Sequence, residues 1–161
     1  MQMNVKCRFA GMVEMWTDGS CEGNPGRGGF ACYIVGGGYD ILLCGAYKVS
    51  TNNRMESMGV LYGLRRCNQE GIKRVVLYTD SAYVAGCLSG NAVKANQDIW
   101  DKVRVLLGAV DVEVRKVKGH SGVERNEKVD RAAYKVMRGG PWLVDEGCSK
   151  RAKKNPTKKR G

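Results

Sequence analysis

Long apolar runs are missing from this sequence of 161 residues. The longest stretch free of charged, amide, serine and threonine side chains runs from Gly28 to Tyr39, and five of its 12 residues are glycine. A helix that crosses a bilayer needs about 20 apolar residues. We therefore expect no transmembrane helix and no membrane partner. Because Lys6 and Arg8 are followed by only a short apolar patch, we expect no signal peptide either.

Paired cysteines are also missing. The seven cysteines are odd in number and form no C-x-x-C motif. Secreted disulfide-rich domains usually have an even, dense set, and zinc sites show closely spaced pairs. We therefore expect most of these thiols to be small buried hydrophobes of an intracellular protein, cytoplasmic or nuclear. They are Cys7, Cys21, Cys32, Cys44, Cys67, Cys87 and Cys148.

Acidic residues are absent from the C-terminal end, which is strongly basic. Of the net charge of +11, residues 148–161 contribute +7, which leaves +4 for residues 1–147. Such a segment attracts polyanions, because neutralising phosphates releases counterions. A solvated tail and a nuclear targeting signal are the alternatives. The basic residues of this tail are Lys150, Arg151, Lys153, Lys154, Lys158, Lys159 and Arg160.

The remaining composition is that of an ordinary globular protein, with 43% hydrophobic and 27% charged residues. The length fits one compact domain. We divide the chain into an N-terminal extension (1–11), a domain (12–140) and a C-terminal segment with the basic tail (141–161). We expect a monomer.

Hydrophobic patterns predict nine helices and strands. A near-continuous apolar run predicts a strand covered on both faces, and alternation of apolar and charged residues predicts another strand before the last helix. The expected strands are Met12–Asp18, Phe30–Val35, Ile41–Val49, Arg74–Thr79 and Val110–Val117, and residues 19–29 are expected to form turns. The expected helices are Arg54–Asn68, Ser81–Leu88, Asn96–Leu107 and Glu124–Arg138.

The order of these elements predicts an α/β fold. Three early strands joined by short turns must pair antiparallel, whereas strands joined through helices add in parallel. The result is a mixed five-stranded sheet, three antiparallel strands followed by two parallel ones, with helices on both faces.

Acidic residues occupy special positions in this fold. Asp18 ends the first predicted strand, Asp80 follows the strand expected beside it, and Glu56 lies in the first turn of a helix. Singly, Glu56 could complement the helix dipole, and Asp130 could lie on a solvated helix face. Together, clustered carboxylates must either hold protons or bind cations, and oxygen ligands favour Mg²⁺ or Mn²⁺.

These acids lie in motifs that resemble the type 1 ribonuclease H family. The motifs are T-D-G-S-C at 17–21 with N-P-G at 24–26, T-N-N-R-M-E at 51–56, Y-T-D-S at 78–81, V-K-G-H-S-G at 117–122 and N-E-K-V-D at 126–130. They occur in the family's order over roughly residues 13–139. The resemblance implies an RNase H-like fold and an endonuclease that cleaves the RNA strand of RNA/DNA hybrids, leaving a 5′-phosphate and a 3′-hydroxyl.

The resemblance also implies roles for the acids and for the single histidine. The four acids would bind two Mg²⁺ ions, with Mn²⁺ as a possible substitute. Asp18 would bridge both ions, Glu56 and Asp80 would hold the ion on the leaving-group side, and Asp130 would hold the ion that carries the attacking water. His120 would assist proton transfer or product departure, and its position between Gly119 and Ser121-Gly122 indicates a loop and not the core.

By the same resemblance, six residues are candidates for contact with the substrate. The 2′-hydroxyl distinguishes RNA from DNA in the shallow minor groove of A-form-like duplexes. Asn24, Asn52, Asn53 and the backbone of Cys21 would read these groups, Thr51 would contact a DNA phosphate, and Asn126 would also bind substrate. Asn24 could also form a turn before Pro25, and Asn52 or Asn53 could cap the helix that bears Glu56, and these structural roles can coexist with substrate contact.

Three departures from the family concern substrate binding. Only 20 residues separate Asp80 from Trp100, so the basic helix and loop of many members is missing, and Lys94 is the only basic residue in between. Val49 and Ala82 stand where an arginine and a polar residue are common. Our hypothesis is that the basic tail takes over the phosphate binding of this missing helix and loop. Two other readings stay open: a non-catalytic nucleic-acid-binding module, and the nuclease domain of a reverse transcriptase.

Overall fold

Three long antiparallel strands form the centre of the fold. In the computed structural model, which describes residues 12–148, they are β1 (Glu14–Gly23), β2 (Gly26–Gly36) and β3 (Tyr39–Ser50). Gly37 and Gly38 join β2 to β3 with φ of +59° and +89°, a region in which other residues are strained. The extension 1–11 and the basic tail, Lys150 to Arg160, lie outside the described residues.

The expectation of turns over residues 19–29 is wrong, because most of this segment belongs to the hairpin of β1 and β2. Both strands continue through this segment, with Gly19 opposite Phe30 and Gly23 opposite Gly26, so that only residues 24 and 25 form the turn. Backbone hydrogen bonding does not depend on side-chain alternation, so a glycine-rich strand gives no pattern to detect. Asp18 therefore lies in the middle of β1 and not at its end.

Parallel strands extend the sheet on the other side of β1. Strand β4 (Arg74–Thr79) pairs with β1, and β5 (Asp111–Lys116) pairs with β4. The strand order is β5-β4-β1-β2-β3-β6, which confirms the predicted mixed sheet but adds a sixth strand to the expected five. This β6 (Trp142–Leu143) pairs with β3 and, with two residues, is too short to show any periodicity.

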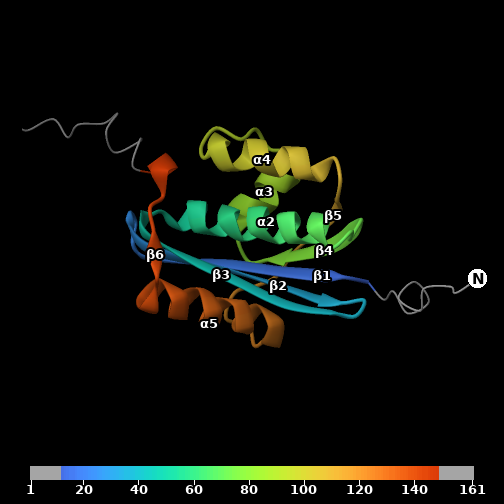
Figure 1. Cartoon of the computed structure of the whole chain (residues 1–161), viewed down its shortest axis with the longest axis horizontal. Coiled ribbons are helices and arrows are strands. Elements are labelled where there is room, and N and C mark those ends of the chain that lie inside the picture. Colours follow the sequence, from blue (N-terminus) through green and yellow to red (C-terminus); the bar gives the residue numbers. More distant parts are fainter. Residues whose placement is uncertain (1–11, 149–161) are drawn as a thin grey trace, which may run out of the picture.

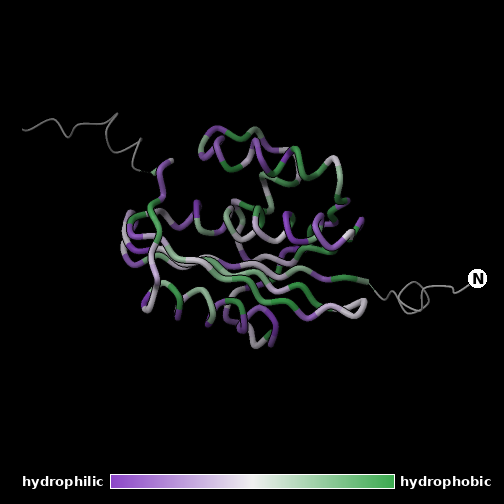
Figure 2. The backbone as a smooth tube through the Cα atoms, in the orientation of Figure 1, coloured by the Kyte–Doolittle hydropathy of each residue, from purple (hydrophilic) through white to green (hydrophobic). Residues whose placement is uncertain are grey.

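Helices cover both faces of the sheet, as predicted (Figure 1). On one face lie α2 (Asn52–Gln69), α3 (Ala82–Leu88) and α4 (Gln97–Leu107), and on the other lies α5 (Glu124–Gly139). Each layer has its own core, and hydrophobic residues concentrate along the strands (Figure 2). Between residues 12 and 148, no helix is long and apolar enough to cross a membrane.

The cysteines follow the prediction only in part. Among those that the structure describes, Cys32, Cys67 and Cys148 are buried, Cys21 and Cys87 are half-buried, and Cys44 is exposed. None of these six forms a disulfide.

The sheet parts between β1 and β4, and this parting positions the site. The ladder joins only Glu14–Trp16 of β1 to Val76–Tyr78 of β4. Strand β4 then ends at Thr79, while β1 continues to Gly23 beside β2 alone. Side chains from helices on opposite faces can therefore meet at this point without crossing a hydrogen-bonded sheet.

Candidate active site

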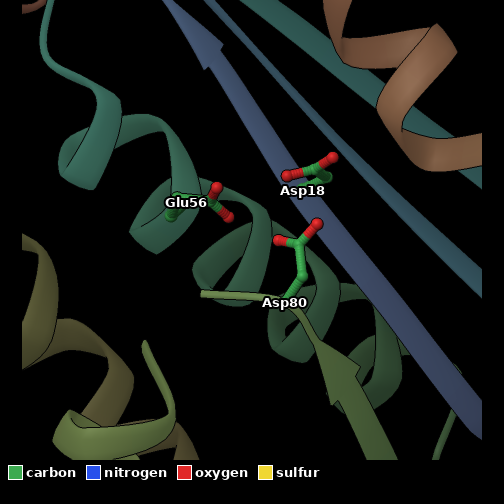
Figure 3. Close-up of side chains that lie close together, drawn as sticks. All are labelled: Asp18, Glu56 and Asp80. Carbon is green, nitrogen blue, oxygen red and sulfur yellow. The ribbon is translucent and has the colours of Figure 1, made fainter. Parts of the chain in front are cut away.

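Three carboxylates meet where β1 and β4 part. Asp18 comes from β1, Asp80 follows the last residue of β4, and Glu56 comes from the second turn of α2. Each offers an oxygen atom, and these oxygens all lie within 4.8 Å of one another (Figure 3). The structure thus brings together three of the four acids that the motifs indicated.

Two glycines make room for this cluster. A Cβ atom on Gly19 would lie 2.5 Å from the backbone nitrogen of Glu56, so any side chain there would push α2 away from β1. The backbone N–H of Gly19 also donates to Asp18 Oδ1 at 2.8 Å. At Gly119, a Cβ atom would lie 3.0 Å from Asp80 Oδ2. The glycine of the T-D-G-S motif is therefore needed for the close approach of strand and helix.

The cluster is electrostatically strained, because buried like charges repel. Burial, then the negative charge of Asp80, raises the pKa of Asp18 to about 7, and Asp130 adds to the shift. Burial, followed by the charges of Asp18 and Asp80, holds the pKa of Glu56 well above its usual range. Within residues 12–148, no lysine or arginine forms an ion pair with these three carboxylates. The positive charge they need must come from elsewhere.

The residues present fit divalent metal ions. Oε2 of Glu56 is buried and has no hydrogen-bond partner among the described residues, which is a costly state for a carboxylate oxygen. A coordinated cation would satisfy it and relieve the repulsion. The set consists only of oxygen atoms, which favours Mg²⁺ or Mn²⁺ over zinc or copper.

The fourth acid and the histidine lie at the edge of the cluster. Asp130, on α5, does not belong to the close group of oxygens and is 39% exposed. Its Oδ2 lies 3.9 Å from Nδ1 of His120, whose side chain is 87% exposed. His120 has a φ of +52°, in a loop between β5 and α5. The prediction that this histidine lies outside the core is confirmed.

Asn126 lies beside the carboxylates, in the first turn of α5. Its Nδ2 is 3.5 Å from Asp80 Oδ2, and its buried Oδ1 has no hydrogen-bond partner among the described residues. The side chain is thus inside the cluster and not on an open surface.

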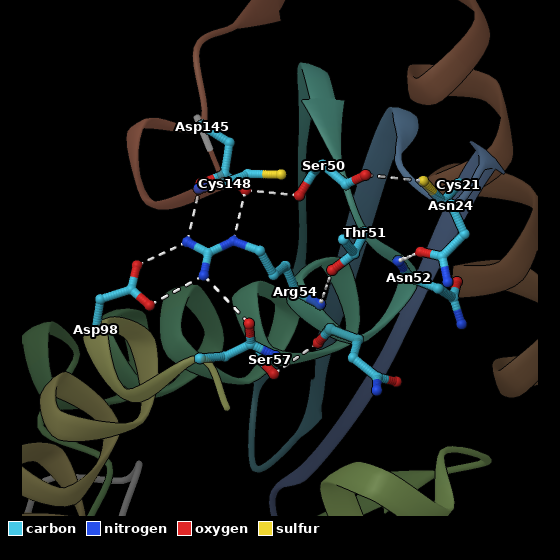
Figure 4. Close-up of polar contacts among 12 residues, drawn as sticks. Cys21, Asn24, Ser50, Thr51, Asn52, Arg54, Ser57, Asp98, Asp145 and Cys148 are labelled. Carbon is cyan, nitrogen blue, oxygen red and sulfur yellow. Dashed lines mark hydrogen bonds and ion pairs between the residues drawn. The ribbon is translucent and has the colours of Figure 1, made fainter. Parts of the chain in front are cut away.

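The remaining predicted substrate contacts share one surface, formed by the β1–β2 turn and the start of α2. Asn24, Asn52 and Asn53 are exposed, and Cys21 and Thr51 are half-buried. The Oδ1 atom of Asn24 accepts a hydrogen bond from the backbone N–H of Asn52 at 3.0 Å, which ties the turn to the helix (Figure 4). The interpretation of Asn52 or Asn53 as the helix cap is wrong, because Thr51 caps α2 through Oγ1.

A buried ion cluster around Arg54 was not anticipated from the sequence. Arg54 binds Asp98 at the start of α4 and Asp145 in the C-terminal segment (Figure 4). The only signal was the position of Arg54 inside the T-N-N-R-M-E motif.

The sheet is mixed and covered on both faces, and carboxylates gather where two of its parallel strands part. This combination is typical of the class of metal-dependent α/β enzymes. The profile of the RNase H family matches residues 10–138. Ribonuclease HI of a Synechocystis strain is 36% identical over 154 residues, covering 86% of this chain and 95% of that protein. Ribonuclease H of Idiomarina loihiensis is 34% identical over 149 residues, covering 84% and 94%.

Solved structures agree with this relationship. RNase H1 of Halobacterium salinarum superposes with a TM-score of 0.66 at 26% identity, covering 81% of this chain and all 100% of that one. LC11-RNase H1, solved in complex with an RNA/DNA hybrid, has a TM-score of 0.65 and covers 78% and 99%, but its 19% identity supports the fold alone. The chain belongs to the RNase H family and is a metal-dependent nuclease.

Proposed function

We propose that this chain hydrolyses the RNA strand of RNA/DNA hybrids, with two metal ions, and leaves a 5′-phosphate and a 3′-hydroxyl. The convergence of Asp18, Glu56 and Asp80 within 4.8 Å, with no ion pair to a lysine or arginine among residues 12–148, is the observation that carries the proposal. The relatives named ribonuclease H support the choice of substrate.

The acids would hold the ions, and the other polar residues would handle protons. Two divalent ions, when bound, supply positive charge to the phosphate and lower the pKa of water. Asp18 and Glu56 offer buried oxygens to them, Asp80 offers a third, and Asp130 offers one from the opposite layer. The His120 imidazole, which is exposed beside Asp130, takes up or releases a proton during the reaction or product departure.

Substrate choice would depend on the exposed asparagines. Asn24, Asn52 and Asn53 lie together at the surface, and the hydrogen bond from Asn52 to Asn24 holds the turn against the helix. Amide side chains both donate and accept hydrogen bonds, which suits them to a 2′-hydroxyl and to the minor-groove edges of bases.

The decisive experiment compares labelled RNA/DNA hybrid, double-stranded RNA and double-stranded DNA, each with Mg²⁺ or with EDTA. Only the hybrid with Mg²⁺ should be cut, and mass spectrometry should find 5′-phosphates. Asp80→Asn should lower kcat by on the order of 10³-fold and keep hybrid binding, because it removes a charge that holds the metal. The matched control is Asp111→Asn, on the edge strand β5. Binding without cleavage by the unmodified chain would instead favour a non-catalytic module.

We also propose that the basic tail binds the phosphates of the hybrid. Residues 12–148 contain 18 basic and 16 acidic side chains, a near balance that offers little general attraction to nucleic acid. The shortened segment after Asp80 adds only Lys94. The last described residue, Cys148, is held near Ser50, because its backbone N–H donates to Asp145, which also accepts from Ser50. Ser50 directly precedes Thr51.

A chain that ends at Cys148 tests the tail. If the tail makes about 4–6 phosphate contacts, the dependence of log Kd on log salt should flatten by nearly one unit per contact. Replacing its seven basic residues with glutamine keeps the length and should have the same effect. An unchanged salt dependence in both variants would leave targeting as the role of the tail.

A further inference from the structure

Arg54 is a buried cation on the helix that bears Glu56. Its side chain is 1% exposed and lies in the first turn of α2. Nε and Nη2 donate to the two oxygens of Asp145 at 2.8 and 2.9 Å, and Nη1 and Nη2 donate to those of Asp98 at 2.9 and 2.7 Å. Both ion pairs are bidentate, which fixes the orientation of the guanidinium as well as its position.

Asp145 is itself held from two sides. Ser50 Oγ donates to its Oδ2 at 2.6 Å, and the backbone N–H of Cys148 donates to its Oδ1 at 3.3 Å. A Cβ atom on Gly147 would lie 2.3 Å from Arg54 Nη2, so the C-terminal segment fits closely around the ion pair. Figure 4 shows α4, the end of β3 and the C-terminal segment meeting at Arg54.

The geometry separates this cluster, which we name the Arg54 clamp (Arg54, Asp98, Asp145 and Ser50), from the carboxylates. Residues two apart on an α-helix point about 200° apart, so Arg54 and Glu56 project from roughly opposite sides of α2. The clamp therefore holds the outer side of the helix, while Gly19 sets how closely its inner side approaches β1. Because the two residues share one helical turn, a shift at Arg54 displaces Glu56.

Stability alone does not require such a cluster. Replacing a buried ion pair with apolar residues is often neutral or stabilising, so ions are a poor way to gain stability. Bidentate ion pairs do fix direction, and the clamp ties the first turn of α2, which leads directly into Glu56, to three separate parts of the chain. This turn also starts with Thr51, which directly follows Ser50.

We propose that Asp145 is a positioning residue: through Arg54 it fixes the first turn of α2, and so sets the place of Glu56 in the metal site. The inference rests on the proposed function for the role of Glu56. It makes the segment around Asp145 a part of the catalytic unit, although no atom of that segment is among the three clustered carboxylates.

The test is Asp145→Asn, which keeps the shape of the side chain and removes its charge. Mn²⁺ binding, measured without substrate by electron paramagnetic resonance, should weaken by about 10-fold, as for other groups that orient metal ligands. On hybrid with Mg²⁺, kcat should fall by a similar factor, and KM should stay nearly constant because the exposed asparagines are untouched.

Val103→Ala is the matched control, because Val103 is buried in α4 and belongs to the core between the helices and the sheet. It should lower the melting temperature, as Asp145→Asn does, but leave Mn²⁺ binding unchanged when both are measured well below their transitions. A stability loss in Asp145→Asn with normal Mn²⁺ affinity and kcat would overturn the proposal.

Ser50→Ala is the second variant if Asp145→Asn does not fold. It removes one hydrogen bond from Asp145 and keeps every charge, so a smaller loss of Mn²⁺ affinity is expected, and no loss would overturn the proposal. Absence of hybrid cleavage by the unmodified chain would overturn the proposed function alone, because the Mn²⁺ measurement needs no substrate. Absence of Mn²⁺ binding by the unmodified chain would overturn both.

Discussion

Two groups of carboxylates flank the same turn of α2 and are opposite in character. At the Arg54 clamp, hydrogen bonds from Arg54 hold the pKa of Asp98 below its usual range. Burial alone would raise the pKa of Asp145, but hydrogen bonds from Arg54 and Ser50 outweigh it and lower that pKa. Around Glu56, burial and like charge raise the pKa values instead.

The difference is the source of the counter-charge. The clamp contains its own cation, so it is complete in the folded chain. The other cluster has no lysine or arginine partner among the described residues and is complete only when metal ions bind. Folding thus supplies a rigid, satisfied ion pair on one side of the helix and a cluster of carboxylates without a counter-charge from the described lysines and arginines on the other.

The largest expected effect on stability comes from Arg54→Ala. Removing the cation takes the bidentate guanidinium partner away from the buried Asp145, which should lower the free energy of unfolding by about 3–5 kcal/mol. Urea denaturation at pH 7 measures it. Arg66→Ala, which breaks an exposed pair with Glu70 on the same helix, should change it by under about 1 kcal/mol. Equal losses of free energy of unfolding in the two variants would mean that the Arg54 clamp stabilises the fold no more than an exposed ion pair does.

Removing a charge from the carboxylate cluster should instead raise the free energy of unfolding. The pKa of Asp18 is raised to about 7, so folding favours the protonated form, and its contribution to stability is lost as pH rises from about 4 to 7. In EDTA at pH 8, Asp18→Asn should therefore stabilise the chain by about 4 kcal/mol, since each of the roughly three pKa units is worth about 1.4 kcal/mol.

Urea denaturation in EDTA at pH 4 and pH 8 checks this sign. At pH 4 the Asp18→Asn variant and the unmodified chain should be nearly equal in stability, since the carboxyl is already protonated. Mg²⁺ at pH 8 should stabilise the unmodified chain more than the variant. Destabilisation by Asp18→Asn at pH 8 in EDTA would contradict the picture of an unsatisfied cluster.

The smallest expected effect is that of His120→Ala. Its side chain is exposed, and in the proposed mechanism metal ions supply most of the catalysis, so kcat on hybrid should fall by about 10-fold, below the usual range for general acid–base residues. Ser121→Ala removes only a loop hydrogen bond to the Lys118 carbonyl and serves as the control. A loss of kcat as large as that of Asp80→Asn would mean that His120 contributes as much to catalysis as the acids do.

Local patterns predicted most of the fold from the sequence. The apolar run of β4 gave its observed bounds, Arg74–Thr79, and α5 differs by one residue from the predicted Glu124–Arg138. The apolar run of β4 is nearly continuous, and α5 spans 16 residues with apolar side chains on one face. The strands of the first hairpin were predicted too short, because their glycines pair through the backbone and show no alternation.

Site residues, too, differ in how well the sequence predicts them. Motifs located the carboxylates, because Asp18, Glu56 and Asp80 each lie in a short segment of fixed spacing. The clamp had no such signal: Arg54 is 44 residues from Asp98 and 91 from Asp145, and each acid taken alone resembles an ordinary surface charge. Only the tertiary structure brings them together.

The tight fit of Gly147 against Arg54 has a practical consequence for anyone who transplants or fuses this domain. A cut at the end of α5 would look natural from the helices alone, yet it would remove the buried Asp145 and leave the Arg54 guanidinium paired with the half-exposed Asp98. The smallest transferable unit therefore extends to Cys148, and added labels or linkers belong beyond it.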